Sequence, residues 1–221
     1  MPIAIALMDR ADLFVLADTL QYSRQSYQNR ARLRTPQGWQ WISVPLKGGQ
    51  HGRPICDVRI RNSQPWRGHH WRALHYNYRR SPYFELYEPR LRPLFEARWE
   101  TLGSLTCCTM EQLAEFLGIS TPVVRASQMP RRPSSVPEIL EDRRTRRLLT
   151  GANTYDVDRD FADEVHILQL DPLRYRQNFA GFVSGLSILD LLFNYGPETL
   201  SMIRQAVSVE KSLSETVGQG G

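Results

Sequence analysis

The sequence contains few cysteines and no long uninterrupted apolar run. No stretch approaches the roughly 18 apolar residues that a membrane-spanning helix needs, which excludes a protein with helical membrane spans. The first residues lack the basic start and the longer apolar segment of an export signal, so we expect a cytoplasmic protein. The three cysteines, Cys56, Cys107 and Cys108, match neither a disulfide framework nor a zinc-binding spacing and suit a reducing compartment. We therefore predict no metal site.

Lysine is also scarce. Lys47 and Lys211 are the only two lysines, so 26 of the 28 basic residues are arginines, and the formal net charge is +5. Two explanations stay open. A biased genome composition accounts for the excess, because arginine and lysine are equivalent on a solvated surface. Alternatively, planar guanidinium groups bind phosphate or carboxylate through paired hydrogen bonds.

Length and composition indicate one ordinary folded domain. The chain has 221 residues, of which 41% are hydrophobic and 23% charged, close to average globular usage. A chain of this length buries roughly 70% of its unfolded surface, so a core forms without disulfides or metal. We expect a single α/β domain over residues 1–207 and a flexible polar tail over residues 208–221.

The pattern of apolar and polar residues indicates alternating strands and helices. Strands are expected at 13–17 and 165–170, and a hairpin with its turn at 35–38 is expected over 27–46. Helices are expected at 66–80, 86–100, 105–117, 138–149 and 187–193. This order predicts an α/β fold: a mixed, mainly parallel sheet flanked by helices, with an N-terminal β-hairpin and a helical C-terminal part.

Two features of the first half of the chain suggest a ligand site. Asp18 follows a buried strand, at the sheet edge where ligands bind in open α/β folds, although a turn or cap aspartate has the same spacing. Alternation along the hairpin aligns Arg30, Arg32 and Arg34 on one face. That face is either an anion-binding stripe or a solvated surface. The glycine-rich basic loop 47–54 either wraps a phosphate or is plain flexible chain.

Two further candidates lie on predicted helices. His70 shares a helical stripe with Trp66 and Tyr78, where it is either a half-buried histidine with a hydrogen-bond partner or a substrate contact. Asp190 interrupts an otherwise apolar helix. It is either a substrate contact or a buried aspartate bonded to an arginine.

Several stretches, in order, resemble the WbqC-like family of bacterial proteins, whose members are often encoded with surface-polysaccharide (O-antigen) genes. The matching stretches are 14–32, 41–45, 66–84, 117–119 and 186–197. The family's usual Gln-Pro, Phe-Pro and Gly-Tyr-Phe opening and its glycine-rich segment after Tyr155 are missing. The resemblance implies a transferase acting on an activated sugar, acyl or amino-acid donor, or an ATP-dependent amide-forming ligase. Such an enzyme uses a nucleotide or acyl donor.

We assign hypothetical roles on this basis. Asp18 and His70 are the catalytic candidates, and the substrate-binding candidates are Gln21, Asn29, Arg30, Arg32, Tyr78, Asp190 and Asn194. The expected partner is a small-molecule substrate rather than nucleic acid, and a homo-oligomer stays open. The alternative is a non-catalytic accessory or polyanion-binding protein, suggested by the sequence pI near 9.3 and the interleaved aromatic residues.

Overall fold

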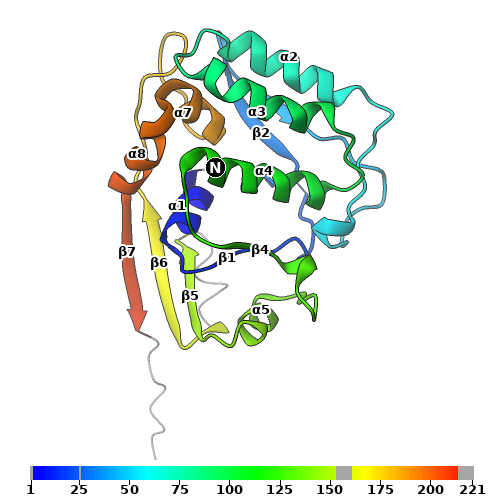
Figure 1. The fold of residues 1–221 in the computed structure, drawn as a ribbon, viewed down its shortest axis with the longest axis vertical. Helices are drawn as coiled ribbons and strands as arrows, with labels where there is room; N and C mark the ends of the chain where they lie inside the picture. The colour runs from blue at the N-terminus through cyan, green and yellow to red at the C-terminus, as the bar shows by residue number, and fades with distance from the viewer. Residues whose placement is uncertain (1, 25, 153–160, 214–221) are drawn as a thin grey trace, which may run out of the picture.

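The strands form three small sheets in this computed structural model, which describes residues 2–24, 26–152 and 161–213 (Figure 1). β1 (Phe14–Leu16) pairs in parallel with β4 (Val123–Arg125). β2 (Arg30–Thr35) and β3 (Gly38–Ser43) form the predicted antiparallel hairpin. In the third sheet, β6 (Glu164–Leu170) runs parallel to β5 (Arg147–Gly151) and antiparallel to β7 (Val207–Leu213). The mixed α/β class is therefore confirmed, with both parallel and antiparallel pairs.

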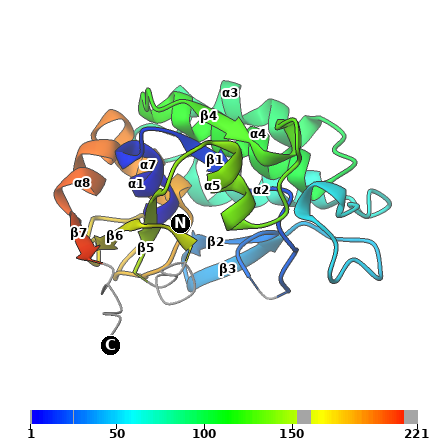
Figure 2. The same ribbon diagram turned by 90° about the horizontal axis from the view of Figure 1, so that it is seen from below.

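Helices fill the space between these sheets (Figure 2). Their bounds are α1 (Pro2–Arg10), α2 (Trp66–Tyr78), α3 (Phe84–Glu96), α4 (Leu102–Leu117), α5 (Val136–Asp142), α7 (Ile188–Tyr195) and α8 (Thr199–Gln205), with short 3₁₀ turns η1 (Ile55–Asp57), η2 (Ala126–Gln128) and η4 (Gly196–Glu198). The ends of α4 follow ordinary capping rules: the Thr101 hydroxyl accepts from the Ser104 amide, and Gly118 adopts a left-handed φ of 66°. The helices predicted at 66–80, 105–117 and 187–193 are confirmed.

The main core lies where the hairpin meets the helices. Leu33 on β2 packs in one buried cluster with Leu74 and Tyr78 on α2, Phe84 on α3 and Phe193 on α7. The aromatic rings of Tyr78, Phe84 and Phe193 stand 5.1 Å apart in tilted and edge-on pairs. The inward face of the hairpin is therefore fixed by the core, which leaves its other face to support a site.

Two sequence predictions differ from the structure. The helix predicted over 138–149 ends at Asp142, because Arg144 adopts a left-handed φ of 50° and residues 147–151 pair with β6 as β5. The tail predicted from residue 208 starts as strand β7, since the alternating segment Val207–Leu213 pairs with β6 along its length. The rest of the predicted tail, 214–221, lies outside the described residues.

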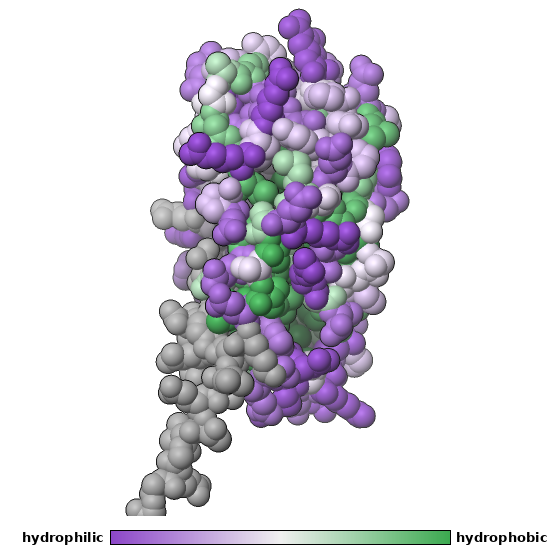
Figure 3. All heavy atoms as spheres, turned by 90° about the vertical axis from the view of Figure 1, so that its left-hand side faces the viewer, coloured by the Kyte–Doolittle hydropathy of each residue, from purple (hydrophilic) through white to green (hydrophobic). Residues whose placement is uncertain are grey.

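The surface near β7 is partly apolar. Figure 3 faces the side of the molecule that carries α8 and β7, and it shows apolar side chains gathered in the middle of that side between hydrophilic ones. Val209 on β7 is among the exposed large hydrophobic residues. Within the described ranges, none of the helices has the length and apolar character that crossing a bilayer would demand.

Candidate functional site

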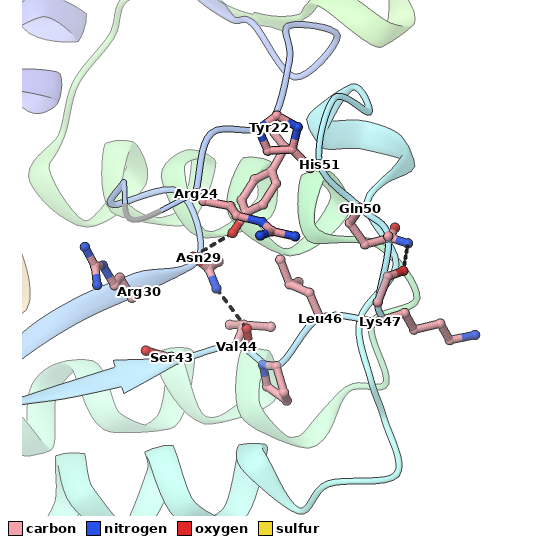
Figure 4. A pocket seen from close by; sticks show the side chains of 13 residues that line it. Tyr22, Arg24, Asn29, Arg30, Ser43, Val44, Leu46, Lys47, Gln50 and His51 are labelled. Carbon is pink, nitrogen blue, oxygen red and sulfur yellow. Dashed lines mark hydrogen bonds between the residues drawn. The ribbon is translucent and has the colours of Figure 1, made fainter.

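A cavity of about 440 Å³ lies at one end of the hairpin, between the segment that enters β2 and the segment that leaves β3 (Figure 4). Its lining residues are Tyr22, Arg24, Asn29, Arg30, Ser43, Val44, Pro45, Leu46, Lys47, Gly48, Gly49, Gln50 and His51. The hairpin brings these two segments together, because residues that flank a pair of antiparallel strands lie side by side. A second cavity, of about 390 Å³, shares Lys47 and is also lined by Arg61, Arg98 and Glu100.

Asn29 fixes the two segments against each other. Its Nδ2 donates to the Val44 carbonyl at 3.1 Å, and its Oδ1 accepts from the Tyr22 hydroxyl at 3.2 Å. Its backbone carbonyl also accepts from the Val44 amide at 2.8 Å. The predicted substrate residue Asn29 therefore lines the cavity and holds its walls.

The glycine-rich loop after β3 is braced rather than free. The Gln50 side chain is buried, with its Nε2 donating to the Gly48 carbonyl at 3.0 Å and its Oε1 accepting from the Arg59 amide at 2.8 Å. Gly49 adopts a φ of 67°, a backbone conformation that residues other than glycine and asparagine rarely adopt. The loop thus presents a fixed backbone to the cavity.

The described lining is cationic and contains no carboxylate. Arg24, Arg30 and Lys47 carry positive charges, and His51 adds an imidazole. Figure 4 shows the Arg24 guanidinium between Asn29 and Leu46, whereas the Arg30 side chain points away along the hairpin. The Arg24 guanidinium has neither an ion pair nor a hydrogen bond to any other residue in the described ranges. This arrangement can bind a phosphate or carboxylate.

Asp18 supports a wall of the cavity from behind. It is buried at the carboxyl end of β1, and its two carboxylate oxygens accept from the Ser127 amide at 2.9 Å and the Ser127 hydroxyl at 2.6 Å. Its backbone carbonyl accepts from the Cys56 amide at 2.7 Å. The exposed Gln21, next along the same wall, pairs with Pro54 in an isolated bridge. These contacts position the segment that leads to Tyr22 and Arg24.

His70 supports the opposite wall. It is 7% exposed, its Nε2 lies 3.2 Å from the carbonyl oxygen of Ser43, and its ring stands edge-on to Trp66 at 5.2 Å. Burial lowers the pKa of His70 from 6.5 to about 4, only partly opposed by the bond to Ser43. The imidazole is therefore neutral at physiological pH and donates from Nε2. The structure places it behind the cavity, bonded to the backbone.

The remaining predicted residues lie in a separate polar cluster beneath the hairpin. The Tyr78 hydroxyl accepts from the Arg34 amide at 2.8 Å, and Asn194 Nδ2 donates to the Asp190 carbonyl at 2.7 Å. Asp190 is fully buried, and neither of its carboxylate oxygens makes a hydrogen bond of normal geometry within the described part of the chain. Burial raises the pKa of Asp190, while the hydroxyls of Tyr175 and Tyr78 lower it.

Arg34 closes this cluster on the hairpin side. It is 2% exposed, and its Nη1 donates to the Gly38 carbonyl at 2.8 Å while its Nη2 donates to the Ala180 carbonyl at 2.6 Å. Arg34 thus joins the hairpin turn to a loop 146 residues further along the chain. The predicted arginine stripe therefore has two uses, since Arg34 is structural and Arg30 lies at the cavity edge.

We predict that Asp190→Asn raises the melting temperature at pH 7. A folded-state pKa above the unfolded value means that stability is present at low pH and is lost as the pH rises through the folded pKa. Asparagine mimics the protonated form, so the gain should shrink toward pH 3. Thermal melts across this range measure it, with Asp190→Ala as the destabilised comparison because truncating a fully buried side chain leaves a cavity. A lower melting temperature for Asp190→Asn at pH 7 would show that the charge is stabilising.

The structure thus separates the predicted residues into groups. Asn29 and Arg30 meet at the cavity with Gln21 beside it, whereas Asp18 and His70 lie behind its walls. The other predicted residues, Tyr78, Asp190 and Asn194, lie in the polar cluster, and Arg32 lies further along the hairpin. The sequence did not single out Arg24 or Tyr22 as site residues, and it indicated His51 only as part of the loop 47–54.

None of the described residues that line the cavity is a cysteine or an acidic residue, and His51 is the one histidine among them. Across the ranges that the structure describes, no group of three or more histidine, cysteine or acidic side chains is arranged to hold a metal ion. Burial and the nearby Asp18 carboxylate raise the pKa of the Cys107 thiol to about 12, so the thiol stays protonated at neutral pH.

Comparison with known proteins gives two matches. The family model described as "WbqC-like protein family" matches residues 5–202. The chain is 32% identical over 214 residues to "Uncharacterized protein Rv1507c" of Mycobacterium tuberculosis (strain ATCC 25618 / H37Rv), covering 87% of this chain and 88% of that protein. No solved structure matches the chain.

Proposed function

The chain belongs to the WbqC-like protein family, and from that premise we propose that it is a small-molecule transferase or amide-forming ligase. Its donor is an activated sugar, acyl or amino-acid compound whose phosphate or carboxylate binds in the cavity. The observation that supports this proposal most directly is that cationic side chains line the cavity and that its described lining residues include no carboxylate. The resemblance to proteins encoded with polysaccharide genes supports the same reaction class.

Arg24 is the proposed anion-binding residue. Its guanidinium stands in the cavity with no hydrogen bond or ion pair to other described residues, so its donors remain available to a ligand. Lys47 adds a second positive charge at the cavity edge, and the braced loop at Gly48 and Gly49 brings backbone close to the same space. A phosphate or carboxylate held by these groups would be oriented for reaction.

His51 is the proposed proton-transfer residue. It lines the cavity and is exposed, in contrast to the buried Asp18 and His70. Histidine is the side chain best suited to exchange a proton near neutral pH. In an acyl or amide transfer, the acceptor nitrogen or oxygen would bond to the donor carbon and release a proton to His51. The leaving group would depart with the electron pair of the broken bond.

A ligand screen tests the proposal. Thermal melts with nucleoside triphosphates, nucleotide sugars, acyl-coenzyme A compounds and amino acids should identify one class that stabilises the protein. A ligand at about 100 times its Kd adds roughly 2.7 kcal/mol. Incubation of that donor with amine and hydroxyl acceptors, followed by mass spectrometry, should then show turnover.

We predict that Arg24→Gln weakens binding of this donor at least tenfold. The variant removes a charge-assisted contact from an exposed side chain, so the melting temperature without ligand should stay within a few degrees of the wild type. Arg92→Gln is the matched control, because Arg92 is an exposed arginine on α3 that pairs with Glu96. The cavity would be refuted as the donor site if no donor class raised the melting temperature, or if Arg24→Gln and Arg92→Gln lost the same amount of donor affinity. Binding without turnover would favour the accessory-protein alternative.

A further inference from the structure

A ladder of alternating arginine and tryptophan side chains runs along the outward face of the hairpin. The Arg30 guanidinium carbon lies 4.3 Å from the centre of the Trp41 ring, and that of Arg32 lies 4.8 Å from Trp41 and 4.3 Å from Trp39. The strand register produces this order, since Arg32 pairs directly with Trp41 and the next pair on the same face includes Trp39. We call these four residues the Arg–Trp ladder.

The ladder begins at the cavity. Arg30 belongs both to the ladder and to the cavity lining, and Ser43, which pairs with Arg30, also lines the cavity. Trp41 is two residues from Ser43 on the same face of β3, a separation of roughly 7 Å along a strand. Tyr27 extends the aromatic surface beside the cavity, with its ring 5.6 Å from that of Trp41. A ligand that fills the cavity can therefore reach the ladder.

The outer rings of this surface are open to solvent. Tyr27 is 40% exposed and Trp39 is 43% exposed, which is unusual for large aromatic side chains. Arg32 holds Trp39 from one side, and the Trp41 ring meets it edge-on at 5.5 Å. The tryptophan is thus fixed in orientation while part of its ring stays available.

We propose that the Arg–Trp ladder with Tyr27 binds the base of a nucleotide whose phosphates occupy the cavity. The inference rests on the proposed function and names the donor class: a nucleoside diphosphate or a compound built on one. Bases stack on aromatic rings and on guanidinium planes, which are the two surfaces that alternate in the ladder. The second cavity, which adjoins at Lys47, offers room for an additional anionic group.

The hydrogen-bonding character of the ladder favours a base over a sugar. Arginine and tryptophan side chains only donate hydrogen bonds. Base edges carry ring-nitrogen and carbonyl acceptors that such donors satisfy. Sugar hydroxyls also need acceptors, which the ladder side chains do not supply.

Titration calorimetry with adenosine diphosphate, uridine diphosphate and inorganic pyrophosphate tests the proposal. Stacking on an aromatic side chain contributes about 1–3 kcal/mol per base, which corresponds to roughly 5- to 150-fold in affinity. We expect at least one nucleoside diphosphate to bind 5-fold or more tightly than pyrophosphate. Tyr27→Leu and Trp39→Leu should each reduce this advantage without changing the affinity for pyrophosphate. Tyr76→Leu, which alters an exposed tyrosine on α2, is the matched control.

Several outcomes would overturn the base site. One is that pyrophosphate and both nucleotides bind with equal affinity. That result would contradict the base site but would still support anion binding in the cavity. Another is that glucose 1-phosphate binds 5-fold or more tightly than inorganic phosphate and that Trp39→Leu removes this difference. That result would show that the ladder binds a sugar. A single-stranded oligonucleotide that binds with steep salt dependence while mononucleotides do not would assign it to a polymer. If pyrophosphate and nucleotides all fail to bind, the proposed function itself is wrong.

Discussion

Replacing Gly103 by alanine is expected to destabilise the protein by about 2–4 kcal/mol. Gly103 lies in the first turn of α4, and a Cβ built there would be 2.5 Å from the Cα of Cys56 and 2.9 Å from its amide nitrogen. Both atoms belong to the backbone of η1, so no side-chain rotation relieves the clash. The helix and η1 would have to move apart, and urea unfolding would record the loss as a lower midpoint.

The same substitution should weaken donor binding. The segment around Cys56 bonds to the wall that carries Tyr22, through Asp18 and through the Tyr22 amide, which donates to the Arg53 carbonyl at 2.8 Å. Displacing η1 therefore moves a wall of the cavity. Gly68→Ala is the control: its Cβ would meet only the end of the Arg72 side chain at 3.5 Å, and alanine favours the helix by up to about 1 kcal/mol. Equal midpoints for the two variants would contradict the close packing of α4 on η1.

The second large effect concerns acid stability and His70. The folded-state pKa is about 4 and the ordinary value is 6.5, so the unfolded chain binds more protons between these values. Stability from the neutral imidazole is fully present above pH 6.5 and is lost as the pH falls toward 4. The difference of about 2.5 pKa units corresponds to about 3 kcal/mol.

His70→Gln isolates this contribution. Glutamine removes the titrating ring and keeps an amide donor for the Ser43 carbonyl, so the slope of stability against pH should be shallower than in the wild type between pH 6.5 and 4. Carboxylates also titrate toward the lower end of this range, and for that reason the difference between the two proteins is the quantity to measure by urea unfolding. His51→Gln replaces an exposed histidine outside α2 and is the matched control, because the neighbouring His69 itself contributes to the lowered pKa of His70. Parallel curves for wild type and His70→Gln would disprove the assignment.

The local parts of the fold follow directly from the sequence. The helices at α2 and α4 are predictable because apolar residues recur at helical spacing and Gly118 supplies the left-handed end of α4. Strand β5 is different. Leu148 and Leu149 also fit the apolar face of a helix, and only their pairing with Val165 and His166 on β6 selects the strand. A sequence window around residue 148 contains no information about that partner.

The candidate site likewise contains some residues that the local sequence predicts and others that depend on distant contacts. Strand alternation correctly puts Arg30 and Arg32 on one face, where the register adds Trp41. Arg24 lies in an irregular segment with no periodicity, so nothing local marks it as a cavity residue. The glycine-rich basic loop is visible in the sequence, but the choice between a braced and a flexible loop depends on Gln50, whose acceptor oxygen bonds to an amide nine residues away.

Arg34 shows that the arginines of this chain fall into two kinds, those that lysine could replace and those that it could not. Its guanidinium donates in two directions, to the hairpin turn and to the loop at Ala180, and the single point charge of a lysine ammonium cannot replace such a fork. Exposed arginines such as Arg92 and Arg98 instead pair with a neighbouring glutamate in water, where lysine serves equally well. If codon usage drifted toward lysine, the exposed arginines could therefore be replaced by lysine without loss of stability. Arg34, which joins the hairpin turn to the loop at Ala180, could not.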